Sequence, residues 1–471
     1  MKASAATSAS GDDDPGWPLA TNPEGRALSS AEGVEDLVRS PRYGLQSSPV
    51  RTNEPPPAQS TGFMSLRPYH GPMQTADTEA TVILSRAAAR RIASGHPWVF
   101  RGDVAWNSAL DLLDPGAAVV FADARLRPLA TGTFNPGTDL CGRVLAAGNA
   151  AIDRTLFARR LKRALDKRTG WFSVPHYRWV HAEGDGLPGL IADRYGDILC
   201  LQVTTAGMER LKPLWLPEIE ALAHPRSIIL RNDLPARGLE GLSLTPEILG
   251  EAVVPPVEVI EYDTRFLADP VGGQKTGWFF DQRTNHRAVA GYAAGADVLD
   301  LYSHAGGFGI PAALAGARSV RMVDVSAPAL SLSRRAAALN GVADRCAWVE
   351  ADVFDFLAPA ADDGLRYGVV VVDPPAFIKD RRKIPAGLSG YRKLARLAAA
   401  RAAPGALFFM ASCSQLASPP AFRTAVEAGL ADAGRAFALL TTARADRDHP
   451  IHPRLPQNDY LKALTYRLDP A

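Results

Sequence analysis

The sequence predicts an α/β protein whose larger part, residues 256–471, forms a doubly wound, mostly parallel sheet of seven strands. Three observations lead to this prediction. Strand-like runs alternate with helical segments from ADVLDLY to the final run YLKALTYRL. Central runs such as YGVVVVDPP are apolar throughout, as in strands that are covered on both faces. Residues able to carry chemistry follow the ends of these runs, where parallel sheets bind their ligands.

Composition bounds the class of protein. The chain has 471 residues, 46% hydrophobic and 22% charged, which is ordinary for a globular protein of several domains. The formal charge of +2 permits a nucleic-acid partner without arguing for one. Four cysteines without paired CxxC spacing disfavour disulfides and cysteine zinc sites, and fit a reducing compartment. No apolar run approaches the ~18 to 20 residues of a membrane helix.

Two smaller domains and an extension are expected before residue 256. Residues 1–78, rich in Ser, Pro, Gly and Ala, predict a disordered, low-complexity extension. Residues 79–148 contain short strand-like runs, including AAVVFAD and LATGTF, and predict a small β-rich domain. Residues 149–255 predict an α+β domain that begins with a basic helix. That helix carries an apolar stripe and either a solvated charged face or one that contacts phosphates, the stripe being Phe157, Leu161 and Leu165.

A glycine loop follows the first strand of the large sheet. In SHAGGFG, glycines 306, 307 and 309 allow the backbone to approach a ligand before a helix begins. Asp324 ends the second strand, where such acids bind ribose hydroxyls, and Asp352 ends the third, near an adenine. The loop departs from GxGxxG and is in isolation also compatible with a packing turn. The set favours S-adenosylmethionine, which has a ribose and an adenine but no pyrophosphate.

The stretch VVVVDPPAFIKD predicts a base-binding turn. Asp373 ends a buried strand, and Pro374 and Pro375 fix the turn that follows. The Asp373 carboxyl can bond a base edge while the Phe377 ring stacks on a flipped or single-stranded base. The structural alternative is that Asp373 caps the turn and Phe377 fills the core.

Cys413 directly follows the strand-like run LFFMAS, which is expected to neighbour the Asp373 strand. Cysteine is commonly buried, so a packing role is the first alternative. Its neighbours Ser412 and Ser414 are polar, however, and are expected to form a rim at the strand end. A thiolate that adds to C6 of a pyrimidine makes C5 nucleophilic toward a methyl sulfonium, and a carboxyl at N3 stabilises the developing charge.

From about residue 80 onward the chain resembles the bacterial 23S rRNA cytosine-C5 methyltransferases that have an N-terminal PUA domain. The stretches that carry the resemblance are GHPWVF, AEGDGLPGLIADRYGD, KTGWFFDQRTNH, LDLYSHAGGFG, VVVDPPAF, SCS and HPIHPRLPQNDYLK. The resemblance implies a class I methyltransferase fold, a PUA-like RNA-binding domain at 79–148, and S-adenosylmethionine and 23S rRNA as ligands. One departure is Ala376, where the family often has Lys, and this is expected to alter an RNA contact.

The resemblance also implies roles for individual residues. Cys413 is the implied nucleophile, and Asp373 lies at the base with Pro374, Pro375 and Phe377. Around the cofactor it implies Tyr302, Ser303, Gly306, Gly307, Phe308, Asp324, Asp352, Asp281 and Arg283. We expect a cytoplasmic enzyme with no metal and no membrane partner, and leave a homodimer open. Two alternatives are methylation of a base nitrogen through the DPPAF turn, without a covalent intermediate, and a catalytically inactive RNA-binding protein.

Overall fold

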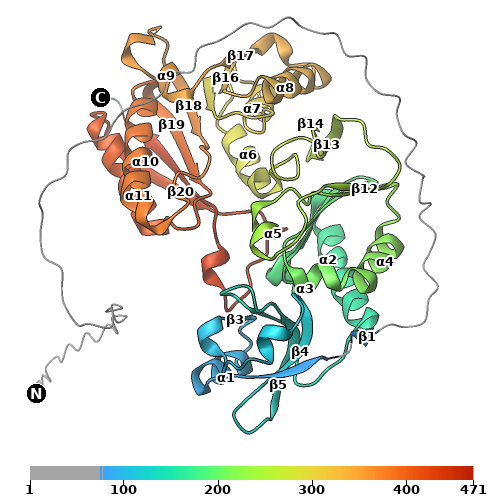
Figure 1. Cartoon of the computed structure of the whole chain (residues 1–471). Coiled ribbons are helices and arrows are strands. Elements are labelled where there is room, and N and C mark those ends of the chain that lie inside the picture. Colours follow the sequence, from blue (N-terminus) through green and yellow to red (C-terminus); the bar gives the residue numbers. More distant parts are fainter. Residues whose placement is uncertain (1–74, 77, 362, 470–471) are drawn as a thin grey trace, which may run out of the picture. The chain divides into compact units, whose positions relative to one another are not determined.

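A computed structural model describes residues 75–76, 78–361 and 363–469 (Figure 1). The predicted disordered extension is residues 1–78, and of these residues 1–74 and 77 lie outside the described part of the chain. In the part of the chain that is described, no helix combines the length and the apolar character needed to cross a membrane. The same residues contain no group of His, Cys, Asp and Glu side chains that could hold a metal ion.

A five-stranded sheet follows the start of the described chain. Its strand order is β2-β4-β5-β6-β3, with β2 parallel and the others antiparallel to their neighbours. Strand β4 is buried along its whole length, and Val119 and Phe121 pack into a core with Phe134. The elements are β2 (Ala80–Ile83), α1 (Arg86–Ala93), β3 (Trp98–Val99), β4 (Ala117–Ala122), β5 (Pro128–Phe134) and β6 (Gly142–Ala147).

A second five-stranded sheet, of order β12-β11-β10-β9-β8, belongs to the central part of the chain. The predicted basic helix is α2, capped by the Asp153 carboxylate on the backbone N–H of Leu156 at 2.8 Å. Phe157 and Leu161 of its predicted stripe are fully buried, which confirms the helical period. The elements are β1 (Thr75–Ala76), β7 (Ile152–Asp153), α2 (Arg154–Trp171), β8 (His176–His181), β9 (Leu190–Tyr195), β10 (Ile198–Val203), α3 (Ala206–Arg210), α4 (Lys212–Ala223), β11 (Ser227–Leu230), α5 (Pro235–Leu239) and β12 (Glu247–Gly250).

The predicted seven-stranded, mostly parallel sheet is confirmed in the remaining chain, with the order β17-β16-β15-β18-β19-β21-β20. Only β21 runs against its neighbours, pairing antiparallel with both β19 and β20. A hairpin, β13 (Val257–Glu261) with β14 (Thr264–Ala268), precedes the sheet. The strands are β15 (Asp297–Leu301), β16 (Ser319–Asp324), β17 (Cys346–Glu350), β18 (Tyr367–Val372), β19 (Ala402–Ser412), β20 (Phe437–Ala443) and β21 (Lys462–Leu468).

Helices cover both faces of this sheet, as the apolar strands predict. In β18, Val369 and Val371 pack on one face with α6, α7 and α8, while Val370 and Val372 pack on the other with α9, α10 and α11 (Figure 1). This alternation follows from the two-residue period of a strand. The helices are α6 (Arg283–Ala290), α7 (Gly309–Leu314), α8 (Ala327–Leu339), α9 (Val353–Phe356), α10 (Ile384–Ala399) and α11 (Pro419–Asp432).

Candidate active site

A cavity of about 290 Å³ lies at the carboxyl ends of β15, β16, β18 and β19. Strands that run parallel bring their ends to one edge, so residues far apart in sequence meet there. The side chains and backbone that line it come from the glycine loop, the DPP turn, the strand end at Cys413 and a short helical turn at 280–282. The predicted site residues among them are Asp281, Tyr302, Ser303, Gly307, Asp324, Asp373, Pro374, Pro375 and Cys413.

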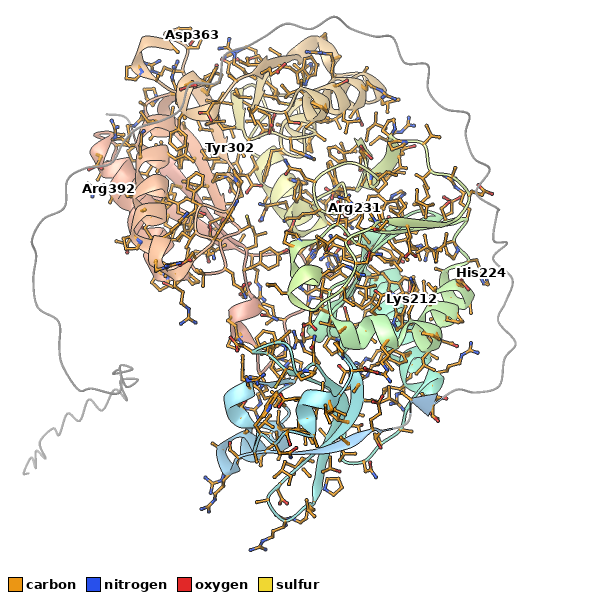
Figure 2. The ribbon with its side chains drawn as sticks, in the orientation of Figure 1. Lys212, His224, Arg231, Tyr302, Asp363 and Arg392 are labelled. Carbon is orange, nitrogen blue, oxygen red and sulfur yellow. The ribbon has the colours of Figure 1, made fainter. Side chains whose placement is uncertain are left out.

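The loop after β15 is bent by three left-handed residues, Tyr302, His304 and Gly306. Positive φ is uncommon outside glycine, and such backbone is concentrated at functional sites. Tyr302, labelled in Figure 2, follows β15 directly and lines the cavity. At Gly307 a Cβ atom would lie 2.6 Å from Nε2 of His286, so only glycine fits without displacing that ring.

Two polar groups of this loop region are suited to a ligand. The Ser303 side chain lines the cavity, is only 4% exposed, and its hydroxyl has no hydrogen-bond partner. The Asp324 carboxylate accepts from the backbone N–H of His304 at 2.9 Å and of Ser326 at 2.8 Å. These bonds hold Asp324 at the cavity wall and leave further acceptor capacity on each oxygen. An unpaired buried hydroxyl beside a fixed acid fits the hydroxyls and amino acid group of S-adenosylmethionine.

Three residues predicted to contact the cofactor have other surroundings. Gly306 supplies a left-handed turn and does not line the cavity. The Phe308 ring is buried against His286 and Phe409, with ring centroids 4.6 and 5.0 Å away. Asp352 is exposed and caps α9, its carboxylate accepting from the Phe354 backbone N–H at 2.8 Å. These positions support the loop and the helix rather than the cavity wall.

Asp373 and Asp281 form a pair of carboxyl groups at the cavity. Burial raises the pKa of Asp373 to about 6, and the charge of Asp281 adds to the rise. Gln282 opposes it, because its side-chain Nε2 donates to the Asp373 carboxylate at 3.0 Å. A carboxyl with this pKa exchanges a proton near neutral pH, which suits a general acid or hydrogen-bond donor.

Asp281 is held in the ionised form. Burial by itself would raise its pKa, but Lys275 and a 2.5 Å hydrogen bond from the Tyr460 hydroxyl bring the pKa below its usual value. Its other oxygen, Oδ1, is buried without a hydrogen-bond partner. The cavity therefore combines a carboxyl that takes up a proton with one that does not, and environments that separate two pKa values in this way are typical of active sites.

Cys413 follows the last residue of β19, Ser412, and its side chain reaches the cavity that Asp373 also lines. Burial raises the pKa of the Cys413 thiol, Lys275 lowers it, and the two carboxyl groups raise it again. The thiol is therefore protonated at rest, and a thiolate must be formed before it can act as a nucleophile.

The predicted polar rim of Ser412 and Ser414 is wrong, because both side chains are fully buried. The Ser412 hydroxyl donates to the Tyr391 hydroxyl at 2.8 Å, and that hydroxyl lies 2.7 Å from the Ser414 hydroxyl. The hydroxyls can be buried because they satisfy one another. These hydrogen bonds fix the residues on either side of Cys413.

Phe377 and Arg283 also lie outside the cavity wall. The Phe377 ring stacks on Tyr391 at a centroid distance of 4.8 Å, which is the core-packing alternative. The Arg283 guanidinium is buried, donates to the backbone carbonyl of His176 and lies 4.2 Å from the Phe172 ring centroid. Arg283 therefore joins α6 to the β8 region.

Sequence reasoning assigned no role to two residues at or beside the site. Lys275 lines the cavity, and Lys462 is buried with its ammonium on the Ser414 carbonyl, next to Cys413. Both residues fall within stretches that carry the family resemblance. Their individual contacts depend on loop conformation and on strand register, which the motifs do not specify.

Two family models match the chain. A PUA-like domain matches residues 82–147, which contain the first five-stranded sheet apart from the first two residues of β2. A model described as S-adenosylmethionine-dependent methyltransferase matches residues 243–467, which contain the large sheet and the cavity. S-adenosylmethionine, the cofactor expected from the loop and its acids, is the cofactor of the matching family.

Curated relatives match over most of their length. A protein named ribosomal RNA large subunit methyltransferase I from Klebsiella pneumoniae is 32% identical to this chain, over 82% of this chain and 98% of the relative. The protein of the same name from Erwinia tasmaniensis is 31% identical, over 82% of this chain and 99% of the relative. The protein of that name from Cronobacter sakazakii is 32% identical over 81% of this chain and 98% of its own.

Two solved structures have the same fold at low sequence identity. A chain described as a SAM-dependent methyltransferase from Streptococcus mutans superposes with a TM-score of 0.70, at 19% identity, over 82% of this chain and 100% of its own. A methyltransferase crystallised with SAH superposes with a TM-score of 0.71 over the same shares. At this identity the likeness concerns the fold.

Proposed function

The chain belongs to the ribosomal RNA large subunit methyltransferase I family, and from this premise we propose that it methylates C5 of a cytosine in 23S rRNA through a covalent bond to Cys413. The observation that carries the proposal is the common cavity of Cys413, Asp373 and the glycine loop. A nucleophile, a proton-exchanging carboxyl and a methyl-donor loop around one base are what this chemistry requires.

The residues present fit the cofactor. When bound, S-adenosylmethionine supplies an electrophilic methyl group. Ser303, with its unpaired buried hydroxyl, and Asp324, fixed by two backbone N–H groups, would hold it beside Gly307, which permits close approach. Nothing in this arrangement calls for a pyrophosphate-binding loop.

Asp373 would act on the base. Its neutral form can donate a hydrogen bond to N3 of cytosine, and its pKa of about 6 lets it share that proton as charge develops. Gln282 fixes the carboxyl by donating to one oxygen, and Pro374 and Pro375 restrict the turn behind it. Such fixed donors stabilise the transition state more than mobile ones.

Cys413 would form and then break one bond. The thiol loses its proton and Sγ bonds to C6 of the base, which makes C5 nucleophilic and able to accept the methyl group. A general base then removes the proton from C5, the Sγ–C6 bond breaks, and the thiolate returns. The cytosine must leave its helix stack to reach the cavity, so a flipped or single-stranded cytosine is the substrate form.

The PUA-like domain and α2 would position the RNA. On α2, the exposed side chains Arg159, Lys162, Arg163 and Lys167 lie away from the buried stripe. Lysine and arginine on such a face contact phosphates, which orients a substrate without selecting its sequence. Binding of this kind weakens steeply as salt concentration rises.

The test replaces Cys413 with Ala and measures methyl transfer from labelled S-adenosylmethionine to 23S rRNA. Cys346→Ala is the matched control, since Cys346 is a partly buried cysteine in β17 outside the cavity. We expect Cys413→Ala to abolish transfer, Cys346→Ala to retain it, and nucleoside mass spectrometry to identify 5-methylcytidine. Full activity of Cys413→Ala would rule out the covalent route.

A second candidate is methylation of a base nitrogen, favoured by the rigid DPP turn at the cavity wall. Here Asp373 and a backbone carbonyl would hold an exocyclic amine, and no thiol would be needed. The same experiment separates the two, because this route leaves Cys413→Ala active and yields an N-methylated nucleoside. The third alternative, an inactive RNA-binding protein, predicts no binding of S-adenosylmethionine in a calorimeter.

A further inference from the structure

Lys462 is a buried lysine at the first position of β21. It pairs with Ser412 in the ladder between β19 and β21, and it is 7% exposed. Its ammonium donates to the backbone carbonyl of Ser414 at 2.6 Å and to that of Ala417 at 2.8 Å. Both carbonyls belong to the turn that begins at Cys413.

No carboxylate lies within ion-pair distance of this ammonium among residues 75–76, 78–361 and 363–469. A buried charge is costly unless it is hydrogen-bonded and paired with an opposite charge. Burial lowers the pKa of Lys462 to about 8, and the negative charges of a Cys413 thiolate and of Asp459 oppose that fall. At neutral pH the ammonium is thus mostly charged, so it would favour a thiolate on the turn that it holds.

The other side of the turn is fixed as well. The Ser414 hydroxyl accepts from the backbone N–H of Ile378 at 3.2 Å, which ties the turn to the segment after the DPP motif. The Tyr391 hydroxyl bridges the hydroxyls of Ser412 and Ser414. The turn is therefore held by neutral hydroxyls on one side and by a single cation on the other.

We propose that Lys462 is the positioning residue for Cys413: its ammonium fixes the turn that presents the thiol and stabilises the thiolate that attacks the base. This rests on the proposed function, in which Cys413 is the nucleophile. Lys462 does not line the cavity, so it acts through Cys413.

Several charged or titratable groups face Cys413 from the elements around it. Lys275 is a second cation, but it is exposed on a loop, where water and salt screen its charge. Lys462 is buried and holds the carbonyl of Ser414 next to Cys413, where water and salt screen its charge less. The groups to be considered in any pH profile are Lys275, Asp281, Asp373, Tyr391, Asp459, Tyr460 and Lys462.

The test measures the pH dependence of Cys413 alkylation by iodoacetamide in the full chain, with the Cys413 peptide quantified by mass spectrometry so that the other three thiols are counted separately. The variant is Lys462→Gln, which keeps a hydrogen-bond donor and removes the charge. We expect the thiol pKa to rise by about one unit. Lys393→Gln, an exposed lysine on α10, controls for charge, and Tyr391→Phe controls for the hydroxyl network; neither is expected to shift it.

Methyl transfer provides a second readout. Lys462→Gln should lower kcat at pH 7 with KM for RNA unchanged, and activity should recover as the pH is raised and more thiolate forms. A purely structural role would show no such recovery.

The proposal is overturned if the Lys462→Gln alkylation profile superimposes on that of the wild type, or if Tyr391→Phe shifts it equally. Should Lys462→Gln unfold at the assay temperature, Lys462→Arg keeps the charge: an unchanged thiol pKa supports the proposal, and a raised one contradicts it. Because alkylation requires no methyl transfer, this outcome is independent of whether Cys413→Ala abolishes activity.

Discussion

Replacing Asp373 with Asn should make the protein more stable at neutral and alkaline pH. The native structure holds this carboxyl in a buried place beside the ionised Asp281, which raises its pKa from 3.8 to about 6. Between these values the native state binds a proton that the unfolded chain does not. The free energy of unfolding therefore falls as the pH rises through this window, and the whole cost is present above pH 6.

The magnitude follows from the shift. The rise of the Asp373 pKa from 3.8 to about 6 corresponds to about 3 kcal/mol. Asn is neutral at every pH and its side-chain oxygen can still accept from Gln282, so the variant avoids this cost. The gain should be about 1 to 2 kcal/mol at pH 5 and about 3 kcal/mol at pH 8.

Urea unfolding of the wild type and of Asp373→Asn at pH 5 and pH 8 measures the gap between their free energies of unfolding. Asp432→Asn is the matched control, because the Asp432 carboxylate is paired with Arg392 (labelled in Figure 2) and its pKa is lowered, so its loss should not stabilise. A gap for Asp373→Asn that is absent, or equal at the two pH values, would refute the assigned cause of the raised pKa. Under the proposed function the stabilised variant also loses methyl transfer, a trade common at active sites.

Two further substitutions test the cavity wall and its surroundings. Gly307→Ala forces the His286 ring to move, at a cost of about 1 to 3 kcal/mol, and should weaken S-adenosylmethionine binding roughly 10- to 100-fold by calorimetry. Gly170→Ala, with open space around its Cβ, should bind normally, and equal affinities would contradict the close approach. Phe377→Ala removes the ring stacked on Tyr391 and should lower stability by about 1 to 2 kcal/mol with RNA affinity unchanged. Reduced RNA affinity at unchanged stability would instead favour stacking on a base.

The sheet and the meeting of its strand ends could be predicted because both follow from local pattern. Apolar runs identify buried parallel strands. Such strands bring Asp324, Asp373 and Cys413 to one edge of the sheet, independently of the conformation of the loops between them. The resemblance to a family then limited the reaction expected at this edge to methyl transfer to RNA.

What could not be predicted depends on side-chain direction and on register. DPPAF contains a carboxyl and an aromatic ring in one turn, but only Asp373 lines the cavity, whereas Phe377 packs on Tyr391. Ser412 and Ser414 have the composition of a polar rim, yet hydroxyls that pair with one another can be fully buried. Lys462 reaches the Cys413 turn because β21 inserts antiparallel beside β19, a pairing that no local pattern specifies.

The antiparallel position of β21 also affects when the site can form during synthesis. Cys413 follows β19, but the ammonium that holds its turn lies 49 residues later in the chain, after α11 and β20. At ~5 to 20 residues per second the ribosome needs roughly 2.5 to 10 s to reach it. Until β21 emerges, the nascent chain presents a cysteine whose turn is not yet fixed. Activity should therefore appear late in translation, after the cofactor loop and the DPP turn are already in place.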